Sequence, residues 1–101
     1  KADAIVAVND THAARLIRAL RLRSRRVPED VAVIGCNNTE FGELVDPQLS
    51  TFDLRVLALA QAMMDLMFAR LEGKNLPQSE RQRVILPHLI QRASTRAVGQ
   101  T

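Results

Sequence analysis

The sequence has 101 residues, of which 47% are apolar and 25% charged, a composition typical of one soluble globular domain. A single Cys excludes an internal disulfide, and no stretch approaches the roughly 20 continuous apolar residues of a membrane span, so we expect a cytoplasmic protein with no membrane contact. The net charge of +3 is too moderate to indicate nucleic-acid binding by itself.

The first predicted element is a short strand at residues 4–8, whose continuous apolar run indicates burial on both faces. Asn9 and Asp10 follow at once and predict the start of a helix that runs from Thr11 to about Leu22. Apolar residues recur along this segment at helical spacing and arginines fall on another side, so the helix is expected to be amphipathic. Because the apolar run at residues 4–8 begins almost at the first residue, we expect a fragment of a longer chain.

Residues 31–35 form a second continuous apolar run of strand length. Two such strands joined through one helix predict a right-handed βαβ unit with parallel strands. Residues 41–45 are expected to form one helical turn, and residues 49–52 a short third strand. The pattern therefore favours an α/β fold.

The longest predicted helix spans residues 54–72, with Asp53 as its N-cap and Gly73 as its stop. It is too apolar for a helix that packs on one small sheet. We therefore expect part of its surface to meet another part of the domain or another subunit. After a polar loop, residues 82–86 and 89–92 are predicted to be short extended segments.

Polar side chains follow both predicted parallel strands: Asn9 and Asp10 after the first, Asn37 and Asn38 after the second. Parallel sheets bind ligands outside the carboxyl ends of their strands. An Asn amide both donates and accepts, which suits sugar hydroxyls or a nucleobase edge. The same residue types also cap helices and form turns. We expect that structural role for Asp10 and Asn38, whereas both interpretations stay open for Asn9 and Asn37.

Catalytic and metal-binding patterns are not visible. His12 and His88 have no acid or thiol at metal-ligand spacing and are expected at the surface, and Cys36 is expected to be a small buried thiol. No glycine-rich phosphate loop or catalytic triad pattern occurs, so no enzyme, cofactor or metal is predicted. The basic run at residues 21–26 is interpreted as a solvated helix end, not as a DNA contact.

Four segments, in this order, closely resemble the C-terminal part of LacI/GalR transcriptional regulators. Two of them match the family's "P-x-L-(S/T)-T" segment and its closing "LPxxLxxRxST" segment. Each motif alone is weak, but their order and spacing make the resemblance specific, and it covers nearly the whole chain. The segments are residues 3–10 (DAIVAVND), 26–35 (RVPEDVAVIG), 46–51 (DPQLST) and 86–95 (LPHLIQRAST).

The resemblance implies a type I periplasmic-binding-protein-like domain, with a parallel sheet flanked by helices in three α/β/α layers. Residues 1–101 would be the C-terminal portion of the effector-binding and dimerisation domain, with the N-terminal helix-turn-helix and the first subdomain outside this chain. The implied protein is a homodimeric bacterial regulator, expected to be a repressor. It would bind a small-molecule effector, such as a sugar, and control operator DNA allosterically through the absent domain.

The resemblance also assigns roles to single residues. Asn9 matches a family position that commonly hydrogen-bonds the effector, and Val56 resembles a position that can line the pocket. Asn37 stands where the family usually has an Asp that contacts the effector. This exchange of a carboxylate for a neutral amide leaves the effector preference open. The implied subunit contact comprises Ala13, Ala14, Ile17, Phe41, Leu44 and Val45.

Two rival functions remain. A sugar-binding protein of a transport system would share the fold but would be exported, and an upstream signal peptide would identify it. An enzyme or phospho-receiver on a flavodoxin-like scaffold would use Asp10 as its functional carboxylate. It would also need an acidic cluster and a Lys after a later strand, which the sequence does not show.

Overall fold

The computed structural model describes residues 2–96. The chain divides into two compact units. We call residues 2–53 and 88–96 the sheet unit, and residues 54–87 the helix unit. The helix unit is inserted between the third and the fourth strand of the sheet unit.

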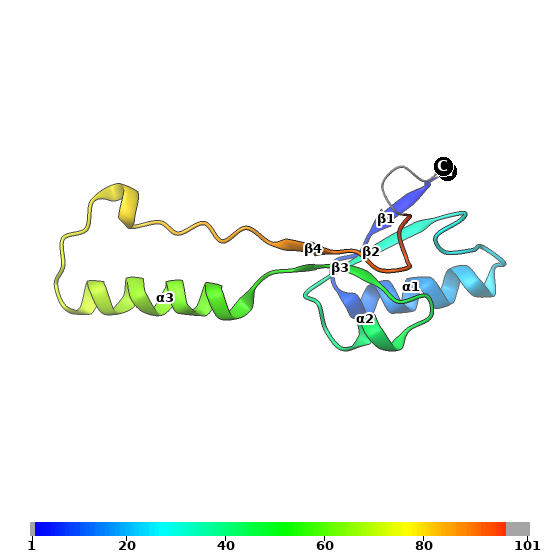
Figure 1. The fold of residues 1–101 in the computed structure, drawn as a ribbon, viewed down its shortest axis with the longest axis horizontal. Coiled ribbons are helices and arrows are strands. Elements are labelled where there is room, and N and C mark those ends of the chain that lie inside the picture. Colours follow the sequence, from blue (N-terminus) through cyan, green and yellow to red (C-terminus); the bar gives the residue numbers. More distant parts are fainter. Residues whose placement is uncertain (1, 97–101) are drawn as a thin grey trace. The chain divides into compact units, whose positions relative to one another are not determined.

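The sheet unit is built on four strands in the order β1-β2-β3-β4 (Figure 1). β1 pairs in parallel with β2, and β2 in parallel with β3. The predicted parallel βαβ arrangement is thereby confirmed. β4 pairs antiparallel with β3, a pairing that was not predicted. The strands are β1 (Ala4–Val6), β2 (Ala32–Cys36), β3 (Ser50–Asp53) and β4 (His88–Ile90).

Two helices, α1 (Asp10–Leu22) and α2 (Phe41–Leu44), contact each other and lie on one face of the sheet (Figure 1). The apolar stripe predicted for α1 packs on β2 and on the chain that enters β3. Within the described part of the sheet unit, these two helices supply one of the two helical layers of the expected three-layer fold. The buried core consists of Ala13, Ile17, Val31, Val33 and Leu49.

Two burial predictions are wrong. β1 was expected to be buried on both faces, but Val6 is 66% exposed. The reason is that successive side chains of a strand point to opposite faces of the sheet: Ile5 packs against the core, and Val6 points to the other face. Cys36, expected to be buried, is the last residue of β2 and only half-buried.

The helix unit contains α3 (Val56–Leu71) and a short 3₁₀ turn, η1 (Gln78–Glu80). The prediction that Asp53 caps α3 is wrong, because Asp53 is the last residue of β3 and lies opposite His88 of β4. Arg55 occupies the N-cap instead, with a left-handed φ of 54°. At the other end, Gly73 has a φ of 73°, the conformation that favours glycine just past a helix, so the predicted stop is confirmed.

α3 has no buried residue. The expectation that another part of the domain or another subunit covers this apolar helix stays a prediction. Within residues 2–96, no helix combines the length and apolar character that a bilayer crossing needs. The large apolar side chains exposed on α3 are Val56, Leu57, Leu59, Met63, Met64, Met67, Phe68 and Leu71.

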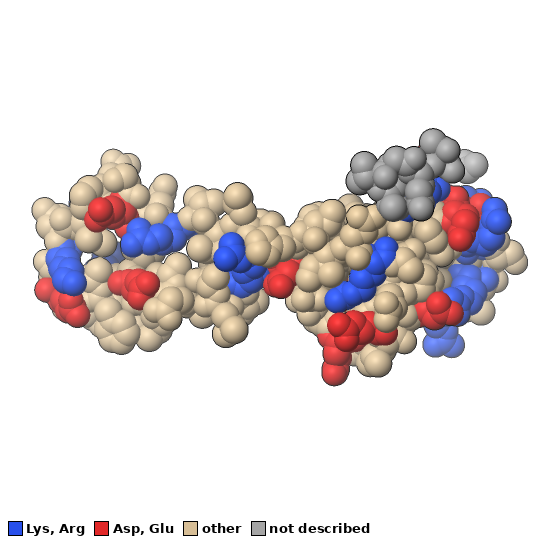
Figure 2. All heavy atoms as spheres, viewed as in Figure 1, with Lys and Arg blue, Asp and Glu red and all other residues tan. Residues whose placement is uncertain are grey.

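The basic run at the end of α1 lies among acidic side chains, as the neighbouring blue and red spheres at the right of Figure 2 show. Arg26 donates to both carboxylate oxygens of Asp30, at 3.2 Å each. Its hydrogen bond to Asp30 lowers the pKa of that carboxyl group to about 2 and raises the pKa of Arg26. Arg21 Nη2 lies 3.8 Å from the Asp46 carboxylate. These exposed pairs fit a solvated helix end.

Candidate functional site

The carboxyl ends of β1 and β2 lie at the same edge of the sheet because the two strands are parallel neighbours. Asn9 follows the first strand, and Asn37 and Asn38 follow the second. The loop after β2 is also tied to β3, since the Asn37 N–H donates to the Phe52 carbonyl at 2.8 Å. We call this edge, defined by Asn9, Asn37 and Asn38, the rim.

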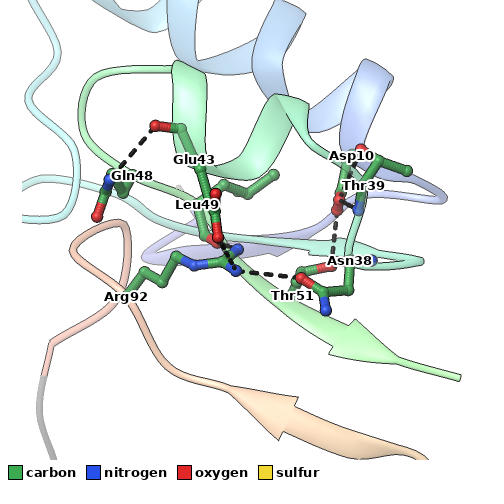
Figure 3. A network of polar contacts seen from close by, with 8 residues as sticks. All are labelled: Asp10, Asn38, Thr39, Glu43, Gln48, Leu49, Thr51 and Arg92. Atoms are coloured by element: carbon green, nitrogen blue, oxygen red, sulfur yellow. Dashed lines mark hydrogen bonds and ion pairs between the residues drawn. The ribbon is translucent and has the colours of Figure 1, made fainter. Parts of the chain in front are cut away.

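Asp10 is the first residue of α1 and has no exposed surface. Its carboxylate accepts hydrogen bonds from the Thr39 N–H at 2.6 Å, the Thr39 hydroxyl at 3.0 Å and the Thr51 hydroxyl at 2.6 Å (Figure 3). One side chain thereby joins α1, the loop after β2 and β3. This is a structural role, and it leaves the carboxylate without the exposure that a phospho-receiver needs.

Gly35, in β2, makes room for this carboxylate. A Cβ added there would overlap Asp10 Oδ1 and lie 2.9 Å from Leu49 Cδ2. Any larger residue at position 35 would therefore displace the hydrogen-bonded group or the core leucine.

Asn38 is bound by Arg92, whose Nη2 donates to Asn38 Oδ1 at 3.1 Å. Arg92 Nη1 donates to the Leu49 carbonyl at 2.9 Å, and Nη2 lies 3.6 Å from the Glu43 carboxylate (Figure 3). The Asn38 N–H in turn donates to the Thr51 hydroxyl at 3.3 Å. The structural role expected for Asn38 is thus seen in its contacts, whereas no role was predicted for Arg92.

Ser94 is a second structural residue that had no predicted role. It has no exposed surface, and its hydroxyl donates to the Val33 carbonyl at 2.5 Å and accepts from the Ser50 N–H at 2.8 Å. Its own N–H donates to the Gln48 carbonyl at 2.8 Å. Ser94 therefore bridges β2 and the entry to β3. The only sequence signal for Arg92 and Ser94 was their place in the closing "RxST" motif.

The side chain of Asn9 caps α1 through one of its two polar atoms. Its Oδ1 accepts the His12 N–H at 2.8 Å and lies 2.8 Å from the His12 ring Nδ1, which makes Asn9 the N-cap of α1. The amide Nδ2 is the group that a ligand could use. His12 and His88 are exposed, as expected.

Asn37 is exposed and has a φ of 98°, in the region that favours glycine and, among other residues, Asn and Asp. Its Oδ1 lies 3.8 Å from the Cys36 thiol. Neither Asn9 nor Asn37 lines the hollow of about 360 Å³ in the helix unit or the hollows of about 540 Å³ and 520 Å³ near the end of α1.

The other predicted site residues have different outcomes. Val56 is the first residue of α3 and 61% exposed, and its role in a pocket stays a prediction. Ala13 and Ile17 were expected in a subunit contact, but they are 0% and 3% exposed in the core of the sheet unit. The interface prediction is wrong for these two, because their face of α1 packs on the sheet.

The remaining predicted interface residues differ in exposure. Phe41 and Leu44, on α2, are exposed apolar side chains. Ala14 is half-buried on α1, and Val45 is half-buried against the core. The interface role of these four residues stays a prediction.

Residues 1–95 match the family described as "Periplasmic binding protein-like domain". The chain belongs to this family. It is 35% identical over 92 residues to the HTH-type transcriptional regulator MalR of Streptomyces coelicolor, a match that covers 91% of this chain and 26% of that protein. It is 33% identical over 95 residues to the lactose operon repressor of Rhizobium radiobacter, with coverage of 93% and 80%.

A solved relative is the LacI family transcriptional regulator from Arthrobacter sp. FB24 in complex with lactose. It matches with a TM-score of 0.78 and 42% identity over 93% of this chain and 36% of that chain. The resemblance of this chain to LacI/GalR regulators, which was inferred from four short segments, is thereby confirmed. The chain spans about a quarter of the length of MalR.

Proposed function

We propose that the chain is the effector-binding and dimerisation portion of a cytoplasmic LacI-type regulator that binds a sugar at the rim. The observation that carries this proposal is the pair of Asn side chains, Asn9 and Asn37, at one edge of a parallel sheet. Buried Asp10 and half-buried Arg92 already hold the loop after β2, through Thr39 and Asn38. The backbone that carries Asn37 is thereby held in place, which reduces the entropy that binding would cost.

The chemistry of the rim suits an uncharged polyol. A sugar hydroxyl both donates and accepts hydrogen bonds, and an amide offers the complementary pair. The nearest buried charge, Asp10, has its oxygens occupied by Thr39 and Thr51. The lactose bound to the Arthrobacter relative belongs to the same chemical class.

Sugar binding would act on DNA through a shift between two arrangements of the regulator. The sugar favours one arrangement of the subdomains, the homodimer transmits it, and a DNA-binding domain outside residues 1–101 gains or loses its fit to the operator. On this chain the subunit contact would involve Phe41, Leu44, Val45 and Ala14. Phe41 and Leu44 expose apolar surface on α2, which supports this assignment.

The test is titration calorimetry of the full-length protein with lactose, galactose, ribose and adenosine. Asn37→Gly removes the amide and keeps the positive φ accessible, so the loop can retain its backbone. We expect it to weaken sugar binding about tenfold, the effect of one lost hydrogen bond of about 1.4 kcal/mol.

The matched control is Gln48→Ala, which removes an exposed amide just before β3, at the end of the strand away from the rim. Its affinity should equal that of the wild type. Equal affinity in Asn37→Gly would remove Asn37 from the site. Failure of every sugar to bind would overturn the proposal, and sugar binding without operator binding by the dimer would indicate a transport protein.

A further inference from the structure

Arg92 contacts three neighbouring segments that lie far before it in the sequence. Its guanidinium donates to Asn38 Oδ1 beside the rim and to the Leu49 carbonyl before β3, and it forms an ion pair with Glu43 on α2. The side chain is only 14% exposed. A planar guanidinium with several fixed donors can hold three such partners at once, which an ammonium group cannot do in the same geometry.

The backbone of Arg92 is itself fixed. Its N–H donates to the Ser50 hydroxyl at 2.8 Å, and that hydroxyl donates to the Arg92 carbonyl at 3.1 Å. The guanidinium therefore extends from an anchored point on the scaffold. A displacement of Asn38 would change the hydrogen bonds of this group, not the position of the chain that carries it.

α2 depends on the same guanidinium. The helix has only four residues and no side-chain N-cap, so little of its stability is local. Gly42 is buried, and a Cβ added there would lie 2.7 Å from Arg92 Nη1, which means that the guanidinium lies directly on the helix backbone. The Gly42 carbonyl also accepts the Leu49 N–H at 2.8 Å, next to the Leu49 carbonyl that Arg92 binds.

We propose that Arg92 is a positioning residue that couples the rim to α2. A sugar held by Asn37 would shift the adjacent Asn38, and Arg92 would pass this shift to the helix that presents Phe41 and Leu44 to the partner subunit. This inference rests on the proposed function, because it needs a sugar at the rim and a subunit contact at α2. It adds the residue, Arg92, that would couple the sugar site to the subunit contact.

The test measures the operator affinity of the full-length dimer with and without a saturating amount of the sugar that binds in the calorimetric panel. The ratio of the two affinities is the coupling between the sites. Arg92→Lys keeps the charge and loses the planar fork. We expect the ratio to fall at least about fivefold, while the sugar affinity of the free dimer changes less than about threefold. A merely structural role would lower the melting temperature and leave the ratio unchanged.

Arg96→Lys is the matched control, because Arg96 lies on the same segment and donates only to the Glu29 carbonyl in the described chain. Its ratio should equal that of the wild type. A second variant, Asn38→Gly, removes the acceptor for Arg92 and tolerates the φ of 50° at that position. The double variant with Arg92→Lys should lower the ratio no further than either change alone, because both changes break the same contact between Arg92 and Asn38.

The outcomes separate this inference from the proposed function. A wild-type dimer whose operator affinity ignores every sugar overturns both. A wild-type dimer that responds, with the same ratio in Arg92→Lys and Asn38→Gly, overturns the coupling role of Arg92 alone. Loss of response in those two variants and its retention in Arg96→Lys is the result that the inference predicts.

Discussion

The sheet unit and the helix unit differ in how much apolar surface they bury and in how their buried polar groups are hydrogen-bonded. In the sheet unit, apolar side chains such as Val33 and Leu49 are fully buried, and the buried carboxylate of Asp10 has three hydrogen-bond donors. In the helix unit, α3 buries none of its residues, and Leu57 is 87% exposed. The described chain therefore contains the reasons for the fold of one unit but not for the apolar surface of the other.

The largest effect is expected from removing the centre of the sheet unit's polar network. Asp10→Ala leaves the Thr39 N–H and the Thr51 hydroxyl without their acceptor in a buried place. We expect a loss of about 3–5 kcal/mol in the free energy of unfolding, measured by urea denaturation. Asp65→Ala, which removes an exposed carboxylate of α3 bound to Gln61, should cost less than about 0.5 kcal/mol. Equal losses would contradict the difference between the two units.

The second prediction concerns local stability in the 101-residue chain. Amide protons of β2 should exchange with solvent at least about 100-fold more slowly than those of α3, because β2 lies in the core and α3 has no buried face. A helix of 16 residues is marginal without tertiary packing. Hydrogen exchange followed by NMR checks this, and equal protection of the two elements would show that the units do not differ in stability.

The third prediction separates the helix-capping role of Asn9 from its proposed role in sugar binding. Asn9→Asp keeps an oxygen for the His12 N–H and removes the Nδ2 donor. The stability should stay within about 0.5 kcal/mol, since a carboxylate is also a good N-cap. Sugar affinity should fall about tenfold. Calorimetry and thermal melting together test this, and unchanged affinity would show that Nδ2 does not contact the sugar.

The smallest expected effect lies at the exposed end of α1. The hydrogen bond from Arg26 holds the pKa of Asp30 at about 2, below its ordinary value of 3.8. A carboxyl group whose pKa is lowered by folding stabilises the fold above its unfolded pKa and loses this effect as the pH falls through the folded value. Asp30→Asn should therefore melt slightly earlier at about pH 7, and the difference should vanish between about pH 4 and 2. A difference that persists below that range would refute this assignment.

The elements that could be predicted from the sequence are those with local signals. The cap at Asn9, the helical spacing along α1 and the apolar runs of β1 and β2 are each read from residues close together in the sequence. These signals sufficed for a parallel α/β sheet with polar residues at one edge. They also identified the apolar stripe of α1 that packs inward, whereas the family resemblance assigned Ala13 and Ile17 to an interface although they belong to the core.

The features that were missed depend on distant partners. Arg92 contacts Asn38 across 54 residues, and Ser94 contacts Val33 across 61. Local patterns carry no information on such pairs. The wrong N-cap has the same cause: Asp53 is an ordinary capping residue, but its pairing with His88 places it in the sheet.

Sugar binding by Asn9 and Asn37, with Asp10 only as their support, can be observed directly. The decisive measurement is a crystal structure of the full-length protein with the sugar that binds in the calorimetric panel. We expect sugar hydroxyls about 2.7–3.2 Å from Asn9 Nδ2 and from the Asn37 amide, with Asp10 still bound to Thr39 and Thr51. A sugar that contacts Asp10 directly, or lies away from both amides, would contradict this assignment.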